Sequence, residues 1–172
     1  MKKEISIGQA QKLTSPNPFV LVSSLKEDRS TNVMALSWWT YVSNHPALVA
    51  IATSNQGMTG RNIKERNYFA ISLVGKELGK AAFRCGACHG FDCDKAASFG
   101  IPLTKEDGEP VSYVDGARVN IICKLRQAID LDDHSLYIGE VIRSYGDEDV
   151  EAVYSMNGYA TPAVITEVTA CD

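Results

Sequence analysis

Residues 32–43 of the chain read Asn32-Val33-Met34-Ala35-Leu36-Ser37-Trp38-Trp39-Thr40-Tyr41-Val42-Ser43, and an apolar run at 47–53 follows them. Apolar, β-branched and aromatic residues favour strands. The stretch also carries small polar side chains, at Asn32, Ser37, Thr40 and Ser43. A strand that only fills a core does not need so many polar groups, because each one buried without a partner costs about 1–3 kcal/mol. The stretch therefore predicts strands that line a binding site.

A loop that leads into a short helix is predicted after these strands. Thr59 is expected to cap a helix ending at Arg66, because a threonine hydroxyl can accept a hydrogen bond from an exposed backbone N–H. The unpaired N–H groups and positive dipole end of a helix start attract anions. The expected ligand is a phosphate, with Ser54, Asn55, Thr59 and Arg61 as candidate contacts and the adjoining Asn62 as a further cofactor-binding candidate. The chain has no G-x-G-x-x-G motif, so a Rossmann nucleotide site is not indicated.

The rest of the chain alternates short strands with a few short helices. The strands at 19–25 and 32–39 should form a hairpin across the charged turn 26–30. Further strands are expected at 47–53, 68–74, 118–129, 135–145 and 163–168, and helices at 76–84 and 95–99. This pattern predicts a mainly β fold: one domain over residues 1–172, forming an antiparallel barrel with a few short flanking helices.

Composition argues against several classes of protein. The net charge of −4 disfavours a nucleic-acid surface, which normally carries a basic stripe. Lys2 and Lys3 precede no secretory apolar segment, and no apolar run is long enough to span a bilayer. We therefore expect a cytoplasmic protein that binds neither nucleic acid nor membrane. Five cysteines are an odd number in a chain without an export signal, so reduced thiols are expected.

Four motifs give the chain a family resemblance. They are N-x-M-x-x-S-W at 32–38, S-x-x-P at 43–46, T-x-x-N-I at 59–63 and D-H-x-L-x-x-G-E-V at 133–141. In this order and spacing the chain resembles the flavin reductase-like proteins with the FMN-binding split-barrel fold, and most closely their flavoredoxin-like members. The resemblance implies an antiparallel split β-barrel, FMN as cofactor, and a homodimer whose second subunit helps to build the flavin pocket.

The resemblance also implies roles for individual residues. It places Asn32, Met34, Ala35, Ser37, Trp38 and Thr40 against the flavin, with Ser43 beside it. A flavin ring needs an apolar slot and polar groups along its pyrimidine edge, and residues 32–43 can supply both. His134 is a catalytic candidate, because the matching histidine of flavin reductases is thought to contact the ring or a nicotinamide. The alternatives are a core strand whose polar residues bond to neighbouring loops, and a turn histidine without a special role.

The cysteine-rich segment 85–93 allows three interpretations. Its pattern Cys85-x2-Cys88-His89-x3-Cys93 offers soft ligands for zinc or an iron–sulfur cluster. All these ligands lie in one short loop, which is awkward for a metal site, and we assign no metal ligand. Cys85 and Cys88 could instead be a redox pair whose pKa values are lowered by Arg84 or a helix N-terminus, so Cys85 is a second catalytic candidate. The third interpretation is ordinary reduced cysteines.

Three functions follow from these observations. The first is an FMN-dependent oxidoreductase that passes electrons from NAD(P)H or a protein donor to an acceptor. The second is a flavoredoxin-type carrier that holds FMN and exchanges electrons with a redox partner protein, without NAD(P)H turnover. The third is a barrel that binds a metal or a partner through the cysteine loop.

Overall fold

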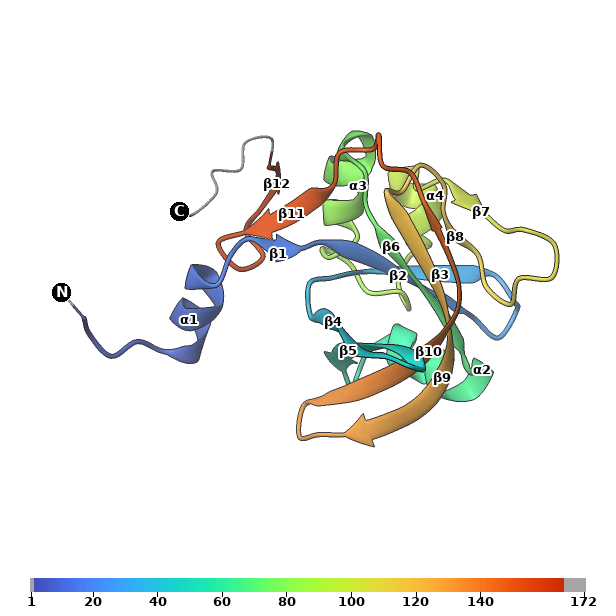
Figure 1. Cartoon of the computed structure of the whole chain (residues 1–172), viewed down its shortest axis with the longest axis horizontal. Helices are drawn as coiled ribbons and strands as arrows, with labels where there is room; N and C mark the ends of the chain where they lie inside the picture. The colour runs from blue at the N-terminus through green and yellow to red at the C-terminus, as the bar shows by residue number, and fades with distance from the viewer. Residues whose placement is uncertain (1, 166–172) are drawn as a thin grey trace.

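The computed structural model describes residues 2–165 and is built around a strongly curved antiparallel sheet (Figure 1). The strands of this sheet lie in the order β3-β2-β6-β9-β10-β5-β4. Their bounds are β2 (Val20–Leu25), β3 (Thr31–Leu36), β4 (Trp39–Asn44), β5 (Ala47–Ser54), β6 (Tyr68–Leu73), β9 (Val119–Asp130) and β10 (His134–Gly146). Two small sheets join β1 (Asn17–Pro18) to β11 (Val153–Met156) and β12 (Thr161–Val164), and β7 (Leu103–Thr104) to β8 (Tyr113–Val114).

Short helices flank the barrel. They are α1 (Ile7–Leu13), α2 (Met58–Arg66), the 3-10 turn η1 (Lys76–Leu78), α3 (Gly79–Arg84) and α4 (Lys95–Phe99). In Figure 1, α3 and α4 lie above the barrel and α2 lies at its lower right, while α1 projects beyond β1 to one side. Every residue of α1 is at least partly exposed. No helix within residues 2–165 has the length and hydrophobicity needed to cross a membrane.

Two cores lie on opposite sides of β2, because successive side chains of a strand point to opposite faces. Phe19 and Leu21 join the cluster under α3 and α4, whereas Val20 and Val22 join the cluster inside the barrel. Burial of each such side chain contributes about 1.5–3 kcal/mol. The predicted mainly β, antiparallel barrel with short flanking helices is confirmed, as is the hairpin of β2 and β3.

Helix α2 packs very closely on the sheet at Gly60. A Cβ atom added there would lie 2.4 Å from the Tyr137 hydroxyl oxygen and 3.0 Å from Thr53 Oγ1. The helix ends at Asn67, which adopts a left-handed conformation with φ of 64°. The sequence predicted the same end, at Arg66. The α2 N-terminus therefore sits in a fixed place between β3 and β5, where the strands of residues 32–54 meet.

Several predicted boundaries were wrong. The strand expected over 32–39 ends at Leu36, and the chain crosses from β3 to the other end of the sheet, where the Ala52 N–H donates to Trp38 O before β4 pairs with β5. The helix cap is Gly57 rather than Thr59, whose hydroxyl is engaged elsewhere. Strand β11 was not predicted. The last strand is Thr161–Val164, and positions 166–168 of the predicted strand lie outside the described residues.

Candidate functional site

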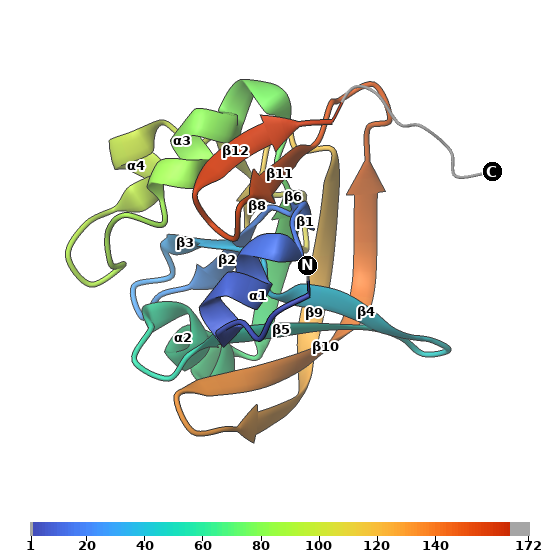
Figure 2. The same ribbon diagram turned by 90° about the vertical axis from the view of Figure 1, so that its left-hand side faces the viewer.

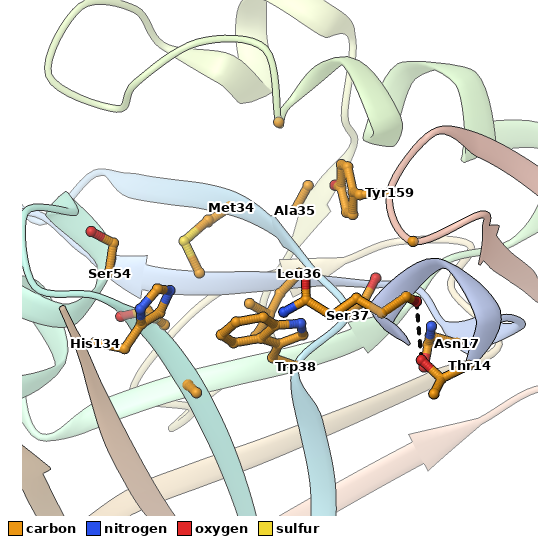
Figure 3. Close-up of a pocket in the computed structure, with 15 residues that line it drawn as sticks. Thr14, Asn17, Met34, Ala35, Leu36, Ser37, Trp38, Ser54, His134 and Tyr159 are labelled. Atoms are coloured by element: carbon orange, nitrogen blue, oxygen red, sulfur yellow. Dashed lines mark hydrogen bonds between the residues drawn. The ribbon is translucent and has the colours of Figure 1, made fainter. Parts of the chain in front are cut away.

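Two neighbouring depressions of about 420 and 250 Å³ lie along β3, and we refer to them together as the groove. Both are lined by Met34, Ala35, Ser54 and Gly86. We call the part around Trp38, His134 and Tyr159 the aromatic end, and the part around Thr59, Cys88 and Lys95 the lysine end. The aromatic end is shown in Figure 3. Volumes of a few hundred Å³ suit a small organic ligand.

The free edge of β3 borders this groove. Within the described residues β3 pairs only with β2, and it is the terminal strand of its sheet. Alternate backbone N–H and C=O groups of an edge strand have no ladder partner, so they are available to a ligand. Because Met34 and Ala35 of this strand line both depressions, the groove combines apolar side chains with a row of backbone donors and acceptors.

The aromatic end is built from three rings on distant segments. Trp38 and His134 lie side by side, with ring centroids 5.0 Å apart (Figure 3). The His134 Nδ1 atom lies 2.9 Å from Asp133 Oδ1, and this hydrogen bond lowers the pKa of Asp133. Tyr159 stacks on Phe83 at 4.7 Å and so holds the opposite side of the groove. The aromatic end can therefore receive a planar ligand beside a histidine whose ring is oriented by a carboxylate.

A buried hydrogen-bond network holds the sheet side of the lysine end. The Asn32 amide donates to Thr59 Oγ1 at 2.9 Å and to Ser24 Oγ at 3.3 Å. Asn62 donates to the same Ser24 hydroxyl at 3.1 Å. These groups join α2 to β2 and β3, and buried polar groups that are fully bonded make a structure rigid.

Lys95 supplies a buried positive charge at the lysine end. Its residue is only 7% exposed, and within residues 2–165 no carboxylate oxygen lies within 4 Å of its ammonium group. A buried charge without a partner is unfavourable. The start of α2 faces the same depression through Gly57, Met58 and Thr59, and no described side chain caps it. A buried cation beside an uncapped helix start is suited to an anion.

The cysteine loop forms the opposite side of the lysine end. Cys85 is buried and donates to Ala81 O at 3.7 Å, and burial raises the pKa of its thiol to about 11. The prediction that Arg84 or a helix terminus lowers this pKa was wrong, because desolvation outweighs the nearby positive charges. Cys88 is half-buried and lines the groove. Among the described residues no three His, Cys, Asp or Glu side chains are grouped so that they could hold a metal ion.

The structure brings most of the predicted site residues to the groove. Its lining includes Asn32, Met34, Ala35, Ser37, Trp38, Ser54, Thr59, Cys85 and His134. The Ser37 hydroxyl lies 2.9 Å from Ser155 Oγ and so also anchors the end of β3 to β11. Sequence reasoning had given no role to Tyr159, and it had noted Lys95 only within a D-K-x-x-x-x-G pattern that resembles a family segment near the flavin. The signal for Lys95 was its place in an Asp-Lys pair at a helix start, whereas nothing local marked Tyr159.

The remaining predicted residues do not line this groove of the single chain. Thr40 and Ser43 are on β4 beyond the crossover, and Ser43 lines a separate depression. Asn55 donates to Leu131 O and Asp132 O and thereby holds the β9–β10 turn. The exposed Arg61 pairs with Glu65 on the outer face of α2, which points away from the helix start. Asn62 faces inward, to Ser24.

Comparison with known proteins gives one consistent result. The sequence model of the family described as flavin reductase like domain matches residues 13–163. An uncharacterized protein of Pyrococcus abyssi is 31% identical over 83% of this chain and 82% of its own. The flavoredoxin of Desulfovibrio vulgaris has a TM-score of 0.84 at 26% identity, with 99% of this chain and 97% of that one covered. An FMN-binding protein from Thermus thermophilus has a TM-score of 0.82 at 18% identity, with 100% and 98% covered. At 18% identity, the likeness to the Thermus thermophilus protein concerns the fold alone. The fold of this chain is a flavin reductase split barrel.

Proposed function

Because the chain belongs to the flavin reductase like family, we propose that it is an FMN-binding oxidoreductase, which passes electrons from NAD(P)H or a protein donor through the bound flavin to an acceptor. The observation that carries this proposal is that the two ends of the groove differ in chemistry. One end is aromatic and bordered by a strand edge, and the other holds a buried cation and a helix start. The two ends of FMN match them, since FMN has a planar ring at one end and a phosphate at the other.

The phosphate would be held at the lysine end. The Lys95 ammonium provides the charge, and the first N–H groups of α2 provide donors with the positive end of the helix dipole behind them. Asn32 and Thr59 bond to each other and fix the helix start against β3, so these donors are already in place before binding. Placing the anion here also gives the buried ammonium of Lys95 a partner of opposite charge.

The flavin ring would lie along β3 towards the aromatic end. Met34 and Ala35 offer apolar contact, and the unpaired backbone groups of β3 can bond to the polar edge of the ring. When bound, FMN supplies the two-electron chemistry, while the protein orients the ring and tunes its environment. His134 holds a proton at Nδ1 against Asp133, which leaves Nε2 as the atom that can meet the ring or a nicotinamide.

A flavoredoxin-type electron carrier is the second candidate. The 26% identity to the D. vulgaris flavoredoxin over nearly the whole chain favours it. Trp38 is 49% exposed at the groove mouth, so a protein partner could reach a ring bound there. In this alternative the protein would exchange electrons with another protein and would not oxidise NAD(P)H.

We also propose that the protein is a homodimer through the β4 side of the barrel. Tyr41 and Val42 are 63% and 48% exposed on this edge strand, and Ile142 of β10 is 46% exposed. Exposed apolar side chains that lie together mark interaction surfaces. Sedimentation of wild type and of Tyr41→Glu tests the proposal: the wild type should be a dimer and the variant a monomer. A monomeric wild type would refute it.

Titration of the purified protein with FMN, followed by flavin fluorescence and absorbance, tests the function. Binding of one FMN per chain is expected. Addition of NADH or NADPH under nitrogen then separates the two candidates, since loss of the oxidised-flavin absorbance indicates a reductase. Binding without this bleaching, combined with reduction by dithionite, indicates the carrier. A protein that does not bind FMN contradicts both.

A further inference from the structure

Asn55 makes hydrogen bonds that the proposed function does not use, and they lead to the β9–β10 turn. The residue directly follows β5, and its backbone N–H donates to Asp133 O at 3.1 Å. Its side-chain amide donates to Leu131 O and to Asp132 O, each at 3.2 Å. A single residue at the end of β5 therefore bonds to three successive carbonyl groups of the turn.

A further bond of Asn55 lies on the other side of His134 in the chain. The Ser135 hydroxyl lies 2.6 Å from Asn55 Oδ1 and 2.7 Å from Asp130 Oδ1, and it shares its proton between these two acceptors. Ser135 itself is only 1% exposed. The amide protons and the oxygen of the Asn55 side chain are therefore all engaged. Because these bonds flank Asp133 and His134, Asn55 holds the segment that carries both residues against the end of β5.

The orientation of the His134 ring depends on this segment. Its Nδ1 atom lies 2.9 Å from Asp133 Oδ1, and its centroid lies 5.0 Å from that of Trp38. The Asp133 side chain is 89% exposed, and among the described residues its only side-chain partner is His134. The place of the carboxylate is therefore set by the backbone of the turn. That backbone is held by Asn55 and by a bond from the Leu131 N–H to His134 O.

FMN binding should not need Asn55. The residue lines neither depression of the groove. The chain after it is held by Ser54, whose carbonyl accepts from the Gly57 N–H at 3.1 Å and whose hydroxyl accepts from the Gln56 N–H at 3.3 Å. The start of α2 therefore stays in place when the Asn55 side chain is removed.

We propose that Asn55 is a positioning residue for the Asp133–His134 pair, so that reduction of bound FMN depends on Asn55 while FMN binding does not. The part that concerns reduction rests on the proposed function. With its Nδ1 proton held by Asp133, His134 presents Nε2 to the aromatic end. Once the turn is free to move, the ring can exchange tautomers and turn away from Trp38. Groups that react with a bound cofactor must be held within a fraction of an ångström, and residues behind them provide that support.

Imidazole nitrogen NMR of the FMN-free protein tests the positioning without flavin. The chain has three histidines, and a His134→Gln variant identifies the signal of His134. In the wild type the neutral ring should carry its proton at Nδ1, because the Asp133 carboxylate accepts it. In Asn55→Ala, and in the isosteric Asn55→Asp that lacks the amide donors, we expect a mixture of the two tautomers. A proton held at Nδ1 in both variants, or at Nε2 in the wild type, would overturn the proposal.

A double-mutant cycle at saturating FMN tests the dependence of reduction on Asn55. Asn55→Ala should bind FMN like the wild type. With NADH under nitrogen it should bleach the flavin at least about tenfold more slowly, since a small displacement of reacting groups is costly in rate. Because Asn55 acts through His134, adding Asn55→Ala to His134→Ala should cause no further loss of rate. Asn44→Ala, at the exposed end of β4, is the control and should match the wild type.

The outcomes separate the inference from the proposed function. Additive losses of rate in the double variant, or weaker FMN binding by Asn55→Ala, would overturn the inference and leave the function standing. A wild type that does not bind FMN, or binds it without being bleached by NADH or NADPH, would contradict the reductase function and with it the part that concerns reduction. The NMR spectra would still decide whether Asn55 positions His134.

Discussion

The two sides of the groove are built in different ways. The sheet side, made of β3, β5, β10 and α2, is held by bonds between residues far apart in the chain, such as Asn32 to Thr59, 27 positions away. The loop side, residues 85–95, is held mainly by local turns, such as the Ala87 N–H to Arg84 O. The sheet side cannot shift without breaking tertiary contacts, whereas the loop side can. The unpaired cation Lys95 is on the loop side, so ligand affinity depends on the more adjustable half of the site.

The largest expected effect is that of Lys95→Met on FMN binding. Removal of the charged partner from a buried anion costs about 3 kcal/mol, or roughly a hundredfold in affinity. The FMN-free variant should melt at or above the wild-type temperature, because the substitution removes an unpaired buried charge. Fluorescence titration and thermal melts measure the two quantities.

The control for this variant is Lys76→Met, which removes the same charge from an exposed ion pair with Glu151. It should leave FMN affinity unchanged. If both variants lose affinity equally, the effect is one of overall charge, and the assignment of Lys95 to the phosphate is wrong.

The second effect compares two glycines, one on each side of the groove. Gly60→Ala places a methyl group against Tyr137 and Thr53 on the rigid sheet side, and we expect a loss of about 2 kcal/mol of unfolding free energy from overpacking. Gly90→Ala places one against Asn32 on the loop side. There the loop can move away from Asn32, so the free energy of unfolding should fall by less than about 0.5 kcal/mol. FMN affinity should fall several-fold, because the loop side of the groove carries Lys95.

Urea denaturation and FMN titration of both variants measure the comparison. Gly8→Ala serves as the control, since a Cβ at this position in α1 meets nothing within 4 Å and the substitution should be neutral or slightly stabilising. The proposed difference between the two sides is contradicted if Gly90→Ala destabilises the protein as much as Gly60→Ala does.

A smaller effect is expected for Asn32→Ala. The change leaves the Thr59 hydroxyl without its donor, while Ser24 keeps the bond from Asn62, and we expect a loss of about 1 kcal/mol of stability. It also loosens the start of α2, so FMN retention should fall. The flavin content of the purified protein and its melting temperature test this. Asn44→Ala, at the exposed end of β4, is the control. Full flavin content in Asn32→Ala would show that the network does not support the site.

The smallest effect is on the dependence of stability on pH. Burial raises the pKa of Cys123 to about 12 and that of Cys85 to about 11, from an ordinary value of 9.0. Above pH 9 the unfolded chain loses these protons first, so it binds fewer protons than the folded chain and stability falls as pH rises. Melting temperatures from pH 8 to 10.5 should show this decline. It should be shallower in Cys123→Ala and in Cys85→Ala, and an unchanged slope in both would contradict the burial of these thiols.

Sequence reasoning succeeded where a residue's role follows from its own neighbours. The strands at 19–25 and 47–53 show the apolar and β-branched pattern of buried strands, and Asn67 ends its helix with a conformation that asparagine tolerates well. It failed for the roles of Thr59, which was expected to cap the helix, and of Asn62, which was expected at a ligand. They bond to Asn32 and Ser24, partners that only the folded chain brings near.

The amino-acid sequence by itself determined most of the long strands, the mainly β class and the family, because periodicity, turn residues and motifs act over a few neighbouring positions. Only the tertiary structure decided that the chain crosses the sheet at Trp38, which sends Thr40 and Ser43 away from the groove. It also decided that Lys95 is buried opposite the start of α2, and that Cys85 is buried. The physical reason is that burial and strand pairing depend on segments dozens of residues apart, which no local pattern brings together.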